Sequence, residues 1–132
     1  MKSRESVVRL KRFQVEEKRR HVEQIDGMVA EFMRMSAELD AQITTEQERT
    51  GIRDTNHFAY STFAKAAIQR RDNLLASAEE LRVQREVAQS VLAGAEEELT
   101  KLELIVERDL ERERHEAGEV RHDGHGRRHS AA

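Results

Sequence analysis

The sequence predicts an all-α fold: a long antiparallel two-helix coiled-coil hairpin with a disordered C-terminal tail. Charged residues make up 37% of the chain and hydrophobic residues another 37%, so burial must be confined to a narrow seam between helices. Proline, which disordered chains accumulate and long helices exclude, is absent. Apolar residues recur at heptad spacing in two long segments separated by one polar stretch.

The first helix is expected over about residues 5–47, where apolar side chains recur at two alternating heptad positions. One position carries Val8, Val15, Val22, Val29, Ser36 and Ile43, and the other carries Lys11, Lys18, Ile25, Phe32 and Leu39. Met28 and Met35 flank this stripe. Because two lysines occupy its N-terminal part, the seam is expected to be tightest near the turn.

A turn is expected over about residues 48–55, where the periodicity is lost. Gly51 can adopt the left-handed conformation that ends many helices, and Asp54, Thr55 and Asn56 are all good N-cap residues. A second helix is expected over about residues 56–114. Its seam residues are Tyr60, Ala64, Ala67, Arg71, Leu74, Ala78, Leu81, Arg85, Ala88, Leu92, Ala95, Leu99, Leu102 and Val106.

Charge supports an antiparallel pairing of the two helices. Residues 1–20 carry eight basic and three acidic side chains, whereas residues 91–116 carry four basic and nine acidic ones. A short turn lays these oppositely charged segments side by side. Residues 1–116 are therefore predicted to form one coiled coil. Residues 117–132, with three glycines and no periodicity, are predicted to form a disordered tail.

Composition disfavours several functional classes. The chain has no cysteine, no secretory signal and no long apolar run, so a soluble intracellular protein without membrane insertion is expected. It also lacks a nucleophile–base arrangement, a phosphate-binding glycine loop and a metal-binding carboxylate pattern. We therefore predict no enzymatic activity and no cofactor.

Two further features suggest ligands but have simpler explanations. His122, His125 and His129 carry metal-binding nitrogens, but the predicted tail offers no scaffold to hold them in a coordination geometry. The N-terminal run of lysines and arginines alternates with acids in a chain of pI about 6.1. We predict neither a metal site nor nucleic-acid binding.

Aromatic residues are concentrated beside the predicted turn. The chain has four Phe and one Tyr, and three of these five are Phe58, Tyr60 and Phe63. On the helical pattern, Tyr60 lies in the seam, Phe63 flanks it and Phe58 points outward. Two interpretations stay open: the rings cap the hairpin end together with Ile52, or they form a patch that docks a partner.

Three stretches of the sequence carry a family resemblance. They are "MKSRESVVRLKRFQVEEKRRHV" at the N-terminus, "ERTGIRDTNHFAYSTFAKAAIQRRDNLL" across the turn and "KLELIVERDLERER" near residue 110. The most specific block runs from Gly51 to Leu75 and contains the Tyr60–Phe63 pair. In these stretches the chain, over about residues 1–116, resembles the FliJ-type flagellar export proteins, most closely their alphaproteobacterial branch.

The resemblance implies a small cytoplasmic component of the flagellar type III export apparatus, located peripherally at the flagellar basal body. Members of the family are antiparallel coiled coils similar to the stalk of rotary ATP synthases. They insert the end with both termini into the hexameric flagellar export ATPase, contact the cytoplasmic domain of the membrane export gate and handle export chaperones. A self-associating structural coiled coil with no export role is the alternative.

The resemblance also assigns candidate binding residues by position. The residues expected to face the ATPase ring are Val8, Arg9, Lys11, Arg12, Arg19, Glu107, Arg108 and Glu111. The residues expected to face the export gate are Met35, Leu39, Phe58, Tyr60, Phe63 and Ile68. The chain departs from the family in its histidine-rich tail and in Ala64 and Ala67, where many members carry large apolar residues.

Overall fold

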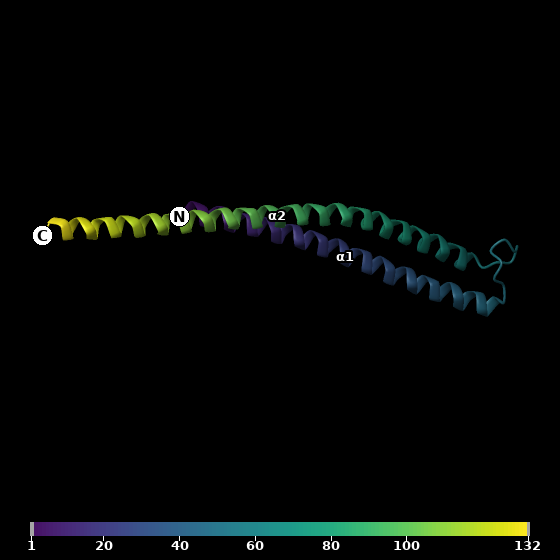
Figure 1. The fold of residues 1–132 in the computed structure, drawn as a ribbon. Coiled ribbons are helices and arrows are strands. Elements are labelled where there is room, and N and C mark those ends of the chain that lie inside the picture. Colours follow the sequence, from purple (N-terminus) through teal and green to yellow (C-terminus); the bar gives the residue numbers. More distant parts are fainter. Residues whose placement is uncertain (1, 132) are drawn as a thin grey trace. The chain divides into compact units, whose positions relative to one another are not determined.

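A computed structural model describes the backbone of residues 2–131 and the side chains of residues 3–119. Within the described backbone there are two α-helices, α1 (Lys2–Thr50) and α2 (Thr62–Ala131), and no strand (Figure 1). Segments of the two helices pack against each other. This arrangement confirms the predicted all-α two-helix hairpin.

The chain divides into two compact units, and each unit contains a segment of both helices. The first unit comprises residues 1–16 and 92–132, and the second comprises residues 17–91. In the first unit, three ion pairs join the helices: Arg4–Glu113, Lys11–Glu98 at 3.0 Å and Arg12–Glu103 at 3.2 Å. Early residues of α1 therefore pair with late residues of α2, as the opposite charges of these segments predict.

The seam between the helices follows the predicted heptads. Every seam residue that the sequence predicts, from Val8 to Val106, is buried or half-buried. In the second unit, Leu39, Ile43 and Ala67 form a buried cluster. In the first unit, by contrast, Leu99 and Leu102 are only half-buried. Val15, Val22 and Ile25, which lie farther from the turn, are nevertheless as deeply buried as Leu39 and Ile43. Burial therefore does not show the tighter seam that was expected near the turn.

Gly51 ends α1 as the sequence predicts. Its φ of 73° lies in the left-handed region, which costs glycine little because it has no Cβ. The Gly51 N–H donates to the Gln47 carbonyl oxygen at 2.9 Å, so the last turn of the helix keeps its hydrogen bond. The helix ends at Thr50, slightly beyond the residue 47 expected from the loss of periodicity.

The second helix begins at Thr62 rather than near residue 56, so Phe58 and Tyr60 lie in the loop. The N-cap is Ser61, whose Oγ accepts the Ala64 N–H at 3.2 Å. Asp54, which was expected to be a cap, instead forms a local turn. Its side chain accepts the Asn56 N–H at 2.9 Å.

The structure extends α2 past the predicted end near residue 114, to Ala131. The absence of proline leaves no strong stop signal, and His115 pairs with Glu119 one turn later at 2.9 Å. Side chains of residues 120–132 lie outside the described part of the chain. The disordered tail predicted for residues 117–132 therefore stays a prediction.

Engineered disulfides test the antiparallel pairing in each unit. We expect Ile43→Cys with Ala67→Cys, and separately Lys11→Cys with Glu98→Cys, to crosslink within one chain under mild oxidation. The native sequence has no cysteine, so each bond can be assigned by mass spectrometry without competing thiols. The control pair is Ile43→Cys with Ala88→Cys, which should stay unlinked because Ala88, in the same unit, shares a groove with Lys18 and His21 instead. Crosslinks found only between chains at low protein concentration would contradict the hairpin.

Candidate partner-binding surfaces

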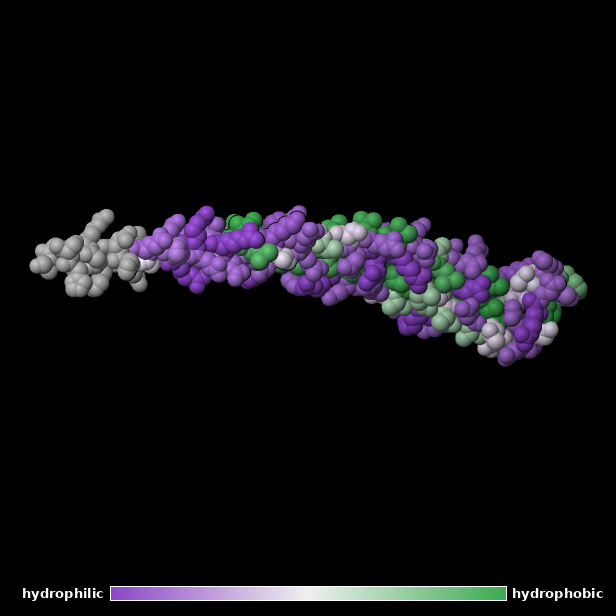
Figure 2. Space-filling model, viewed as in Figure 1, coloured by the Kyte–Doolittle hydropathy of each residue, from purple (hydrophilic) through white to green (hydrophobic). Residues whose placement is uncertain are grey.

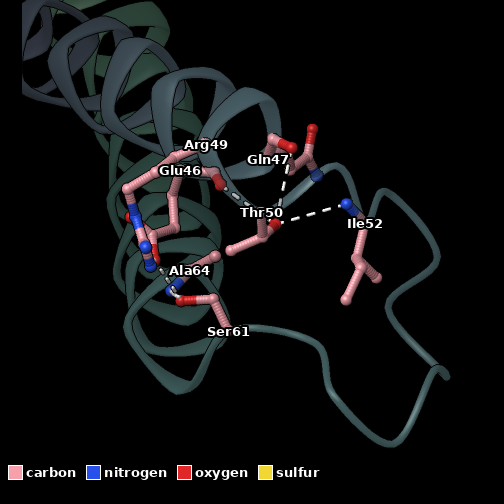
Figure 3. Close-up of polar contacts among 7 residues, drawn as sticks. All are labelled: Glu46, Gln47, Arg49, Thr50, Ile52, Ser61 and Ala64. Atoms are coloured by element: carbon pink, nitrogen blue, oxygen red, sulfur yellow. Dashed lines mark hydrogen bonds and ion pairs between the residues drawn. The ribbon is translucent and has the colours of Figure 1, made fainter.

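Residues of both helices and the loop between them meet in a hydrogen-bonded network at the turn (Figure 3). The Ser61 hydroxyl donates to Glu46 Oε1 at 2.9 Å, and Arg49 Nη2 lies 2.5 Å from the same oxygen. The Thr50 hydroxyl donates to the Glu46 carbonyl oxygen at 3.1 Å and accepts the Ile52 N–H at 3.3 Å. These contacts join the end of α1 to the start of α2.

The aromatic residues beside this network divide into one buried and two exposed rings. Tyr60 is 6% exposed, and its hydroxyl accepts a hydrogen bond from Gln47 Nε2 at 2.9 Å. Phe58 is 96% exposed and stacks only on His57, with ring centroids 4.7 Å apart. Phe63 is 57% exposed. Tyr60 therefore closes the hairpin end, whereas Phe58 contributes almost no packing to it.

The other three predicted gate-facing residues lie along the seam near the turn. Leu39 belongs to the buried cluster, Ile68 packs against that cluster, and Met35 is half-buried. Leu39 and Tyr60 have little surface left for a partner. Within the predicted set, Phe58 and Phe63 thus present the most apolar surface at this end.

The predicted ring-facing residues fall mainly in the first unit, where they differ in exposure and partners. Val8 is buried in the seam, while Lys11 and Arg12 form the ion pairs with Glu98 and Glu103. Four residues of the set are exposed and have neither hydrogen bond nor ion pair within the described residues: Arg9, Glu107, Arg108 and Glu111. The eighth, Arg19, is half-buried in the second unit and has a polar partner.

Arg9 also lines a groove of the first unit. This groove has a volume of about 320 Å³ and is bordered by Val8, Val106, Glu5 and Arg12. An apolar floor with charged walls suits a partner side chain that combines an aliphatic part with a charged end. Three residues of the predicted ring-facing set, Val8, Arg9 and Arg12, therefore line one groove, and their role in binding stays a prediction.

No family model, no curated protein and no solved structure matches this chain. Among the described residues, no group of three or more His, Asp or Glu could hold a metal ion. His122, His125 and His129 lie outside the described side chains, so the expectation for them is not tested. Neither helix contains, in its described part, an apolar segment long enough to cross a membrane.

Sequence reasoning missed a second set of exposed apolar residues in the first unit. Val7 is 46% exposed, Leu10 is 55% exposed and Phe13 is 56% exposed. On a solvated coiled coil, these outward positions would normally carry charged or polar side chains. Their heptad positions, outside the seam stripe, were the signal available in the sequence. They add apolar surface to the unit that contains most predicted ring-facing residues.

The carboxylate of Glu46 should make the turn sensitive to acid. Its hydrogen bonds with Arg49 and then Ser61 hold the pKa of Glu46 below its ordinary value of 4.5. A lowered folded-state pKa means that the stabilisation is present above pH 4.5 and is lost as pH falls through the folded value. We expect protection of the Ala64 amide from hydrogen exchange to decrease as the pH falls below the ordinary Glu value of 4.5.

The control for this measurement is Glu46→Gln, which cannot ionise. Its Ala64 protection should be lower than that of the native chain at pH 7 and should change little on acidification. If Ala64 protection depends on pH in the same way in the native chain and the variant, ionisation of Glu46 does not stabilise the start of α2.

Proposed function

We propose that this protein is a component of the flagellar type III export apparatus and acts as a stalk-like coiled coil. In this proposal the first unit binds the hexameric export ATPase and the turn end of the second unit binds the cytoplasmic domain of the export gate. The protein supports secretion of flagellar proteins, flagellum assembly and motility. It works in the bacterial cytoplasm at the basal body, together with export chaperones, and has no catalytic role of its own.

The almost completely exposed ring of Phe58 is the observation that carries this proposal. Exposing a phenylalanine to water forgoes about 1.5–3 kcal/mol of transfer free energy, and the stack on the exposed His57 ring covers almost none of the Phe58 surface. Aromatic side chains are among the commonest anchors of protein interfaces. Phe58 also lies inside the block from Gly51 to Leu75 that carries the resemblance. A docking role for this end of the hairpin accounts for both facts.

The charged surface of the first unit supports the second half of the proposal. Arg9, Glu107, Arg108 and Glu111 are exposed and have no partner within the described residues, so they are available to polar groups of another protein. Electrostatic complementarity of this kind fixes orientation and speeds association. The ion pairs of Lys11 with Glu98 and of Arg12 with Glu103 join the two helix segments of the same unit.

Binding of the full chain to each proposed partner tests the function directly. The purified export ATPase and the purified gate domain should each retain the chain in pull-downs, and the chain should stimulate ATP hydrolysis by the ATPase. Multi-angle light scattering at micromolar concentration should give a monomer. A stable oligomer that binds neither partner would instead support the self-associating structural coiled coil.

A further inference from the structure

The two flanks of the seam in the second unit differ in chemistry. Residues seven apart in a coiled coil lie on the same side of the seam. One flank consists of His21, Met28, Met35 and Gln42 of α1 together with Arg70, Ser77, Gln84 and Val91 of α2. We name these eight residues the open flank. Only Arg70 among them carries a full charge, although charged residues make up 37% of the chain.

The opposite flank is closed by ion pairs between the helices. Arg71 reaches from the α2 seam to Asp40 at 2.8 Å, and Arg85 reaches in the same way to Asp26. Asp26 and Asp40 are two heptads apart on α1, so both pairs lie on the same side. Both of these interhelical ion pairs therefore lie on the closed flank, opposite the open flank.

Three grooves follow the open flank. The largest, about 430 Å³, lies between Val87 and Val91 of α2 and Lys18 and His21 of α1. A second of about 240 Å³ and a third of about 120 Å³ both involve Met35 and Arg70. Grooves that recur on one side of a two-helix coil have the arrangement into which the side chains of a third helix can pack.

The outward face of α2 at the largest of these grooves is unusually apolar. Val83 is 57% exposed, Val87 62% and Val91 48%. Valines four residues apart form a continuous ridge along a helix. Figure 2 shows hydrophobic surface, in green, among the hydrophilic side chains of the packed helices. An exposed apolar ridge beside a groove marks a binding surface rather than a solvated face.

The charges that line the grooves identify the chemistry of the occupant. Lys18 and Arg70 line them, and neither has a hydrogen bond or ion pair within the described part of the chain. Glu38, the acid that lines the smallest groove, is already paired with Arg34 at 2.5 Å. Arg34 also pairs with Glu31, so the groove-lining charges that have no partner within the described residues are those of Lys18 and Arg70, both positive.

We propose that the open flank binds an acidic amphipathic helix of another protein. Its apolar face packs on Val83, Val87 and Val91, and its carboxylates pair with Lys18 and Arg70. Lys18 shares a groove with Ala88, so the two cations are separated by about 18 residues of α2, or about 27 Å. The bound helix therefore carries acids about five turns apart. This inference goes beyond the export role and does not rest on it.

A designed peptide tests the proposal without any export component. The probe is a fluorescein-labelled amphipathic helix of about 28 residues with a Leu/Ala stripe and glutamates about 18 positions apart. A sister peptide carries lysines in place of these glutamates. In anisotropy titrations with the full chain, the glutamate peptide should bind at least about ten-fold more tightly than the lysine peptide, a difference of about 1.4 kcal/mol.

Variants of the chain locate the binding surface. Val87→Glu should abolish binding, and Arg70→Glu should reverse the preference so that the lysine peptide binds more tightly. The matched controls are Leu75→Glu, an apolar residue on the opposite flank, and Arg20→Glu, an exposed arginine that lines none of the three grooves. Both controls should bind like the native chain. Circular dichroism should show native helix content in every variant, and Val83→Gln replaces Val87→Glu if the latter unfolds.

Three results would overturn the proposal. The first is that neither peptide binds, or that both bind equally well. The second is that Leu75→Glu weakens binding as much as Val87→Glu does. The third is that the chain alone sediments as a dimer that Val87→Glu dissociates, which would make a second copy the occupant of the flank. None of these results depends on whether the export ATPase or the gate binds the chain.

Discussion

Arg9→Glu is expected to abolish most of the stimulation of ATP hydrolysis by the export ATPase while leaving the hairpin folded. Arg9 is exposed and has no polar partner within the described residues, so its replacement removes no intramolecular contact. Losing one side of an interfacial charge pair costs about 2–5 kcal/mol, which corresponds to a fall in affinity of about 30-fold or more. The measurement is a titration of ATPase activity with the native and variant chains.

Arg12 and Glu103 provide a companion test because they pair with each other at 3.2 Å. Arg12→Glu combined with Glu103→Arg exchanges the two charges and keeps the ion pair. If ATPase binding needs a positive charge at residue 12, this exchange should still impair stimulation although the helices remain joined. Native stimulation by a folded Arg9→Glu chain would remove Arg9 from the binding surface.

Phe58→Ala is expected to weaken gate binding by about 2 kcal/mol or more, about 30-fold in affinity, with almost no change in melting temperature. The ring is 96% exposed, so its truncation removes little buried area from the hairpin. Calorimetric titration with the gate domain and a thermal melt of the same sample measure both quantities. Swimming motility should fall with the affinity.

Tyr60→Ala and Phe63→Ala separate docking from capping. Tyr60 is 6% exposed and bonded to Gln47, so its truncation should destabilise the fold by about 3 kcal/mol. Phe63→Ala should resemble Phe58→Ala, with a smaller effect because half of its ring is already covered. If Phe58→Ala lowers the melting temperature but leaves the affinity per folded molecule unchanged, Phe58 is a cap and not an anchor.

The seam could be predicted from the sequence because burial in a coiled coil depends mainly on the heptad spacing of apolar residues. When two long helices pair, their apolar stripes must meet, and the spacing of those stripes defines which residues are covered. Residues as different as Val8, Ser36 and Arg71 all lie where the repeat puts them. The antiparallel direction was also predictable. A short turn brings the second helix back along the first, and the opposite charges of the two chain ends then attract each other.

The start of α2 could not be predicted in the same way. Ser, Thr, Asp and Asn all cap helices, and the loop contains several of them, so propensity alone does not choose. The choice depends on tertiary contacts: Tyr60 must bury its ring in the hairpin, and Ser61 must reach Glu46. The Asp54 side chain instead accepts a hydrogen bond from the Asn56 N–H within the loop. Phe58 was expected on the outer face of the second helix. It is exposed, but it lies in the loop that precedes α2.

The open flank is only partly predictable from the sequence. Heptad analysis asks which positions are apolar and buried, whereas this flank is marked by missing charge at positions 21, 28, 35 and 42. Whether such a row is grooved depends on side-chain sizes across the seam, which only the three-dimensional arrangement gives. That Glu38 pairs with Arg34 and not with Arg70 is likewise a matter of side-chain geometry.

The two ion pairs on the closed flank also restrict how the hairpin can misfold. A seam rich in alanine would tolerate sliding one helix by a heptad, because one small residue simply replaces another. Such a slip would move Arg71 from Asp40 to the level of Met33 or Gln47, and Arg85 from Asp26 to that of Arg19 or Met33. Exposed pairs contribute only about 0–1 kcal/mol each. Their larger effect is to exclude misaligned hairpins during folding, so that the chain reaches one register.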